Sequence, residues 1–147
     1  MFGPGDSFFS ALDRIARFTP IIPMFGAGTT RLQPVYVDDV ADAVARALQD
    51  SATQGKIIEL GGPQAYPYRL LIEFVLRHKG RRRLLLPLPF LVWDALARLG
   101  SVLPRPPVTR AQIALMKRDN VVDSTCLTFK DLGIDPRSIE EIVPAYL

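Results

Sequence analysis

The sequence predicts an α/β domain that is mostly helical and contains a few short strands. Residues 35–37 (Val-Tyr-Val) favour an extended conformation and lead directly into Asp38 and Asp39. Carboxylates suit the start of a helix because they accept hydrogen bonds from its free N–H groups and oppose its dipole. A second short apolar run, residues 56–60, stops at residues 61–63 (Gly-Gly-Pro). Apolar residues recur at helical spacing in several other segments, which predicts amphipathic helices around these strands.

The first half of the chain predicts two helices separated by a short extended piece at residues 21–22. Ser7 suits the cap of the first helix, and its inward face is expected to comprise Phe8, Leu12 and Ile15. The second helix follows Asp39, with Asp42 and Arg46 as an exposed pair one turn apart. Its apolar side is expected to comprise Val40, Val44, Ala47 and Leu48.

The second half predicts a helix over residues 67–79 closed by Gly80, a strand over residues 82–86 and a further helix over residues 90–103. The apolar stripe of that last helix is expected to comprise Val92, Leu96, Leu99 and Leu103. A proline-rich link at residues 104–107 follows. Three short helices are then expected. Their terminal signals are a capping box from Thr109 to Gln112, Gly133 after residues 127–132, and a second box from Ser138 to Glu141.

Composition limits the classes of function. The 147 residues are 48% hydrophobic and 22% charged, which indicates a globular domain long enough to bury a core. The net charge of +3 has one concentrated basic run, residues 81–83 (three arginines), so no nucleic-acid partner is predicted. The single cysteine, Cys126, excludes an internal disulfide. We expect a cytoplasmic protein, since the sequence has neither a signal-peptide pattern nor an uninterrupted transmembrane stretch.

Few residues form patterns that carry chemistry. The one histidine, His78, has no cysteine or histidine at ligand spacing, so no metal site is predicted. Arg31 and Gln33 lie two apart, which places them on the same side of an extended chain. A guanidinium beside an amide suits a phosphate or carboxylate group, and the alternative is a loop arginine in water.

Two further stretches have both a functional and a structural interpretation. In the functional interpretation residues 81–83 bind an anion, and in the structural one they are solvent-exposed residues that precede the following strand. The apolar stretch from Leu84 to Leu103 is a docking or membrane-interface surface, or it is a core helix that packs on the sheet.

Several motifs resemble those of the extended and atypical short-chain dehydrogenase/reductases. Residues 31–41 resemble the segment R-x-x-x-V-x-V-x-D-V-A, residues 2–6 resemble the end of R-P-x-x-V-x-G-P-x-D, and residues 58–63 resemble Y-E-L-G-G-P. Two further motifs are G-x-G-x-x-R at residues 26–31 and G-R-R-R-x-L-L-P-L-P at residues 80–89. The combination of these motifs along the chain is similar to that of one branch of the family. That branch holds the short-chain-dehydrogenase-like accessory subunit of respiratory complex I and its bacterial NAD(P)-binding relatives.

The resemblance implies the C-terminal part of a Rossmann-like fold whose N-terminal dinucleotide-binding half is missing. Residues 1–147 would form a single incomplete domain, made of the substrate-side lobe plus the last strand and helices of the dinucleotide-binding fold. NAD or NADP would bind the full-length parent, and neither is expected to bind this chain alone. By the same resemblance, Arg31 and Gln33 would contact the substrate. Gly3, Pro4 and Asp6 would lie near the nicotinamide end of the cofactor.

The sequence also departs from the family. No glycine-rich loop precedes Phe2, and no Tyr-x-x-x-Lys pair exists: Tyr36, Tyr66 and Tyr68 are followed four residues later by Val40, Leu70 and Ile72. A phenol acidified by a neighbouring ammonium is therefore not available. We expect no catalytic residue in this chain, and no activity from the chain alone.

Three functions follow from this combination. The first is a fragment of an NAD(P)-binding oxidoreductase or epimerase-like protein that provides substrate-side contacts. The second is a non-catalytic accessory or assembly subunit of respiratory complex I, docked through Leu84 to Leu103 at the respiratory complex or the surface of the inner membrane. The third is a small anion-binding module that uses residues 81–83.

The predicted strand at residues 56–60 would lack the neighbours of a complete parallel sheet. Unpaired N–H and C=O groups and a bare apolar flank favour association. We therefore expect that the chain pairs with a separate N-terminal half, associates with itself through the exposed sheet edge, or is marginally folded.

Overall fold

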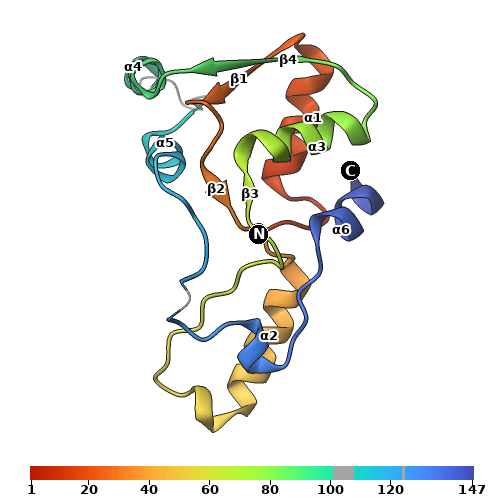
Figure 1. Cartoon of the computed structure of the whole chain (residues 1–147), viewed down its shortest axis with the longest axis vertical. Coiled ribbons are helices and arrows are strands. Elements are labelled where there is room, and N and C mark those ends of the chain that lie inside the picture. The colour runs from red at the N-terminus through yellow and green to blue at the C-terminus, as the bar shows by residue number, and fades with distance from the viewer. Residues whose placement is uncertain (101–107, 124) are drawn as a thin grey trace. The chain divides into compact units, whose positions relative to one another are not determined.

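The computed structural model describes residues 1–100, 108–123 and 125–147. The fold is mixed α/β and mostly helical, as predicted (Figure 1). The elements in chain order are α1 (Ser7–Phe18), β1 (Ile21–Phe25), β2 (Arg31–Leu32), α2 (Val37–Gln49), η1 (Ser51–Thr53), β3 (Tyr66–Pro67), α3 (Tyr68–His78), β4 (Leu84–Leu88), α4 (Phe90–Gly100), α5 (Arg110–Met116), η2 (Phe129–Leu132) and α6 (Ile139–Tyr146).

The chain divides into two compact units, which are described separately. The first unit comprises Met1–Ala11, Gln33–Ala65 and Val121–Leu147. The second comprises Leu12–Leu32 and Tyr66–Asn120, so α1 begins in the first unit and ends in the second. The prediction that residues 1–147 form a single incomplete domain stays a prediction.

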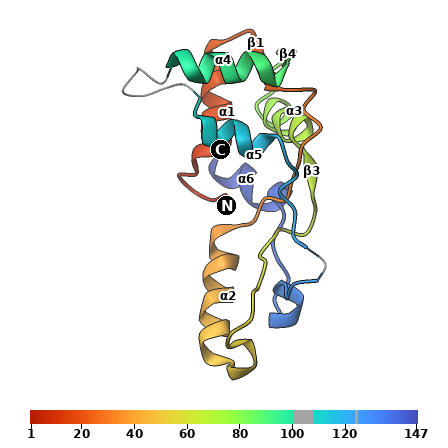
Figure 2. The same cartoon turned by 90° about the vertical axis from the view of Figure 1, so that its left-hand side faces the viewer.

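In the first unit, α2 packs against the short helix η2, which is drawn in blue beside it (Figure 2). The core of this contact comprises Val35, Ala43 and Phe129. The predicted apolar stripe of α2 is wrong at Val44 and Leu48, which are 52% and 84% exposed, whereas Val40 packs against this core as predicted. The buried residues of α2 are instead Asp39 and Ala43, each 2% exposed.

Two strand predictions in this unit are wrong. Residues 35–37 are reduced to a parallel bridge between Phe2 and Tyr36, because α2 already begins at Val37. Residues 56–60 contribute one parallel bridge, between Ile58 and Leu127. A strand needs a ladder of partners. Among the described residues this segment has a single bridge, and Ile57 is 74% exposed.

In the second unit, β1 and β4 form a parallel pair that runs in register from Ile21–Leu84 to Phe25–Leu88 (Figure 1). The chain between these strands includes α3, which buries Leu71, Ile72, Val75 and Leu76. The strand predicted at residues 82–86 is confirmed with a shift of two residues. Strands β2 and β3 form a separate antiparallel pair.

Helices α4 and α5 share a core of Trp93, Ala97 and Ile113. The indole Nε1–H of Trp93 donates to the Met24 carbonyl at 3.1 Å, which satisfies its polar group inside the core. The predicted stripe of α4 is wrong: its buried residues are Trp93, Ala97 and Gly100, and Val92, Leu96 and Leu99 are exposed. The rest of that predicted helix, residues 101–103, and the link at residues 104–107 lie outside the described residues.

The predicted helix ends are confirmed in several places. The capping box of Thr109 and Gln112 begins α5, and the box of Ser138 and Glu141 begins α6. Gly133 closes η2 in the left-handed conformation at φ 65°. At α1 the prediction is wrong in detail, because the cap is the Asp6 carboxylate, which accepts from the Phe9 N–H at 2.7 Å.

Candidate functional site

The residues predicted near a cofactor lie in the loop before α1. Gly3 is buried against residues 36–37, where an added Cβ would lie 2.6 Å from Val37 Cγ1. Asp6 is bound at both carboxylate oxygens. Oδ1 caps α1, and Oδ2 accepts from the Tyr146 hydroxyl at 2.7 Å. Burial and this hydrogen bond raise the pKa of Tyr146 above its usual value. Pro4 is exposed beside them. Cofactor contact by these three residues stays a prediction.

Arg31 in β2 is held by its main chain. Its N–H donates to Asp119 Oδ1 at 2.8 Å, and its C=O accepts from the Asn120 N–H at 2.8 Å. The side chain is exposed, and among the described residues its guanidinium has no hydrogen-bond or ion-pair partner. A fixed main chain with an uncommitted guanidinium suits a residue that binds an anionic group. Substrate contact by Arg31 stays a prediction.

Gln33 spans three segments of the first unit. Its Nε2 donates to the Gly62 carbonyl at 2.7 Å, and its Oε1 accepts from the Val122 N–H at 3.0 Å. Both ends of the amide therefore bind the main chain. The glycine pair makes room for this arrangement, because a Cβ on Gly61 would lie 2.6 Å from Gln33 Cδ. Substrate contact by Gln33 also stays a prediction, and its observed partners give it a structural role.

The acidic pair at the start of α2 forms a polar cluster with the chain before α6. Asp39 is 2% exposed. Its Oδ2 accepts from the Arg137 N–H and its Oδ1 accepts from the Arg137 Nε–H, both at 2.7 Å. The Arg137 guanidinium lies 4.4 Å from the centre of the Tyr36 ring. The hydrogen bond to Asp39 raises the pKa of Arg137, and the hydrogen bond to Asp38 raises that of Tyr36. This cluster fixes Arg137 to α2 within the first unit.

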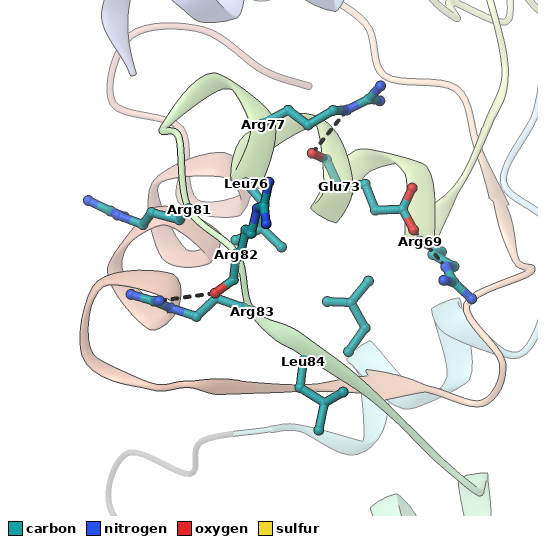
Figure 3. Close-up of a pocket in the computed structure, with 9 residues that line it drawn as sticks. Arg69, Glu73, Leu76, Arg77, Arg81, Arg82, Arg83 and Leu84 are labelled. Atoms are coloured by element: carbon teal, nitrogen blue, oxygen red, sulfur yellow. Dashed lines mark hydrogen bonds and ion pairs between the residues drawn. The ribbon is translucent and has the colours of Figure 1, made fainter.

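The second unit contains a pocket of about 500 Å³ between the end of α3 and the start of β4 (Figure 3). Its lining residues are Arg69, Glu73, Leu76, Arg77, Arg81, Arg82, Arg83, Leu84 and Leu85. Of these arginines, residues 81–83 were expected from the sequence as an anion-binding run, whereas Arg69 and Arg77 were not. Their spacing of four on either side of Glu73, which puts all three on one face of a helix, was the available signal.

The stretch predicted to dock carries large exposed apolar side chains. Leu84 and Leu86 in β4 are 63% and 41% exposed, and Leu91 and Leu99 in α4 are 80% and 77% exposed. Docking through this stretch stays a prediction.

Among the described residues, no helix is both long and apolar enough to cross a bilayer. Within the same residues, no group of three acidic, histidine or cysteine residues is arranged to hold a metal ion.

Comparison with known proteins identifies relatives along most of the chain, although no family model matches. The chain is 31% identical over 150 residues to the mitochondrial NADH dehydrogenase [ubiquinone] 1 alpha subcomplex subunit 9 of Arabidopsis thaliana, covering 95% of the chain and 37% of that protein. It is 33% identical over 118 residues to the mitochondrial NADH-ubiquinone oxidoreductase 40 kDa subunit of Neurospora crassa, covering 80% of the chain and 32% of that protein. The chain therefore spans about a third of the length of these curated relatives.

Solved structures show the same fold. The GDP-mannoheptose C4 reductase MlghC of Campylobacter jejuni, solved with NADP bound, matches 93% of this chain and 42% of its own at a TM-score of 0.58 and 14% identity. The UDP-glucuronic acid 4-epimerase of Bacillus cereus, solved with NAD, matches 90% of this chain and 42% of its own at a TM-score of 0.51 and 17% identity. The resemblance derived from the motifs is thus confirmed. The chain is related in sequence to these subunits of NADH–ubiquinone oxidoreductases, and it has the fold of part of the solved reductase and epimerase.

Proposed function

We propose that this chain supplies the substrate-side part of an NAD(P)-binding protein of the short-chain dehydrogenase type and does not catalyse a reaction by itself. The observation that carries the proposal is the match along 95% of the chain to a subunit of NADH dehydrogenase. Two features support it: the fold is that of part of enzymes solved with NADP or NAD, and no Tyr-x-x-x-Lys pair occurs in the sequence.

Within this proposal, the second unit is the substrate-side lobe, and the first unit holds the last helices and strand segment of the dinucleotide-binding fold. The uncommitted guanidinium of Arg31 binds an acidic group of the substrate. Gly3, Pro4 and Asp6 lie near the nicotinamide end of NAD or NADP. Gln33 positions the loop that carries Gly62, which is its observed contact, and so acts on the substrate side indirectly. Residues 56–60 pair with further strands of a longer protein or of a second copy.

Titration of the purified chain with NADH and NADPH, followed by cofactor fluorescence, tests the cofactor part of the proposal. We expect no binding, because the sequence contains no glycine-rich phosphate loop. Saturable binding of either cofactor would overturn it. Sedimentation velocity tests the edge at residues 56–60: association that increases with protein concentration is expected. A non-associating monomer with one cooperative melt contradicts the proposed pairing.

A second candidate function is accessory to a respiratory complex. The Arabidopsis and Neurospora relatives are both subunits of NADH–ubiquinone oxidoreductases, and α4 exposes Leu91 and Leu99. We infer that this helix face docks on such a complex at the surface of the inner membrane, on the cytoplasmic side in a bacterium. An exposed apolar helix face favours association, because a partner that covers it removes apolar surface from water.

Copurification tests this docking. A tagged chain is expected to copurify NADH:quinone oxidoreductase activity, and the L91E/L99E variant is expected to lose it. Leu48 in α2 is 84% exposed and belongs to the other unit, so L48E is the matched control and should retain the activity. Equal recovery by all three chains would exclude α4 as the docking surface.

A further inference from the structure

The arginine-lined pocket of the second unit concentrates positive charge. Five arginines and one glutamate line it, and three leucines complete the wall. Leu76 is 6% exposed, so part of the wall belongs to the packed interior. An excess of positive charge around one pocket favours the binding of an anion there.

Three of these guanidinium groups are already held in place by hydrogen bonds within the protein. Arg81 Nη1 donates to Asp13 Oδ1 at 2.7 Å, and Arg83 Nε donates to the Ala16 carbonyl at 2.8 Å. Arg69 Nε donates to Glu73 Oε1 at 2.7 Å, which satisfies the one acidic group of the lining. Figure 3 shows Arg81 and Arg83 extending toward α1 and away from Glu73.

Two guanidinium groups remain largely uncommitted. Arg82 is exposed, and among the described residues its side chain has no hydrogen-bond or ion-pair partner. Among the described residues, the side chain of Arg77 makes one long hydrogen bond, of 3.4 Å from its Nε to the Glu73 carbonyl, which leaves its terminal nitrogens to donate elsewhere. Their donors lie on two elements, the end of α3 and the segment that leads into β4 (Figure 3).

We propose that this pocket binds a phosphate group, with Arg77 and Arg82 as its principal ligands. The planar fork of a guanidinium matches the oxygens of a phosphate, and two such forks neutralise its charge. The leucines beside them accommodate the apolar part of a phosphate-bearing molecule. A nucleic acid fits less well, because none of the described residues that line the pocket is aromatic and able to stack on a base.

The phosphate can come from a soluble molecule or from a phospholipid headgroup, and two probes distinguish these sources. Calorimetry with pyrophosphate tests the soluble source. Cosedimentation with phosphatidylcholine vesicles, with and without phosphatidylglycerol, tests the headgroup. Both use the full chain. The test of phosphate binding is independent of the proposed function, because neither probe requires a nicotinamide cofactor or a respiratory complex.

Variants with matched charge make the test specific. R77Q/R82Q removes the two proposed ligands, and R110Q/R118Q removes the same charge from exposed arginines outside the pocket. We expect the pocket variant to lose affinity about tenfold or more for the probe that binds, because two charge-assisted interactions are removed. The control variant should change by less than about threefold, the effect of net charge alone.

Arg82→Glu reverses one charge at an exposed position, where we expect the fold to be retained. It should weaken binding at least as much as R82Q. Binding of pyrophosphate identifies a soluble phosphate ligand, and binding of phosphatidylglycerol vesicles alone identifies a headgroup. The proposal is overturned if neither probe binds, or if the pocket and control variants lose affinity equally.

Discussion

Replacement of Gly62 by alanine tests the close approach of two segments in the first unit. The main chain of Gly62 lies against the Pro34 carbonyl, and an added Cβ would overlap the Pro34 oxygen. Because that obstacle is main chain, it has no rotamer that relieves the overlap. The loop at Gly62 must move, and with it the carbonyl that accepts from Gln33 Nε2 at 2.7 Å.

The expected loss of stability follows from these two effects. Inserting a methyl group into a packed site costs about 1–3 kcal/mol. Losing the hydrogen bond from Gln33 costs about 0.5–1.5 kcal/mol more. Gly62→Ala should therefore lower the free energy of unfolding by about 1.5–4.5 kcal/mol. At Gly61 the nearest atoms belong to the side chains of Gln33 and Val122, which can shift at the expense of the Gln33 hydrogen bonds, so Gly61→Ala should cost less than Gly62→Ala.

Equilibrium unfolding in urea, followed by far-ultraviolet circular dichroism, measures these differences. Gln64→Ala is the control, since Gln64 is exposed two residues away and should change stability by less than about 0.5 kcal/mol. If Gly62→Ala unfolds at the same urea concentration as the wild type, or is more stable than Gly61→Ala, the main chains at Gly62 and Pro34 do not meet as described.

Two further predictions concern the second unit. Trp93→Ala removes the largest side chain of the core shared with Ile113 and should lower the free energy of unfolding by about 3–5 kcal/mol. Trp93→Phe loses mainly the hydrogen bond to the Met24 carbonyl and should cost clearly less. Urea unfolding of both variants measures these losses, and equal losses would contradict the prediction. Burial raises the pKa of Tyr68 from 10.0 to about 12. Because its neutral form is favoured in the folded state, its contribution to stability is complete below pH 10.0 and is lost as the pH rises to about 12. The urea midpoint should fall over that range in the wild type and less steeply in Tyr68→Phe, and parallel curves would refute the assignment.

The site residues show how far local patterns reach. Arg31 and Gln33 were predicted as a polar pair on one side of an extended chain. In the structure β2 ends at Leu32, so the alternation that the prediction used does not extend to Gln33. The partners of Gln33 are the carbonyl at residue 62 and the N–H at residue 122. These partners lie 29 and 89 residues from Gln33 in the sequence, so a pattern of neighbouring residues cannot predict them.

The sequence by itself determined those features whose energy is local. The capping boxes at Thr109 and Ser138 and the glycine end of η2 at Gly133 each depend on a few neighbouring residues, and the structure has all three where the pattern predicts them. The family resemblance was also contained in the sequence, since short motifs in order are visible without coordinates.

Only the tertiary structure decided which faces are buried and which extended segments become strands. In α4 the apolar stripe that includes Leu96 and Leu99 matched helical periodicity as well as the face of Trp93, and packing against Ile113 selected the latter. The segment around Ile58 has strand-forming residues but one bridge, because a strand acquires its hydrogen bonds from chain that is distant in sequence. Periodicity reports that a segment is amphipathic or extended. The identity of its partner depends on long-range contacts, and these exist only in the folded chain.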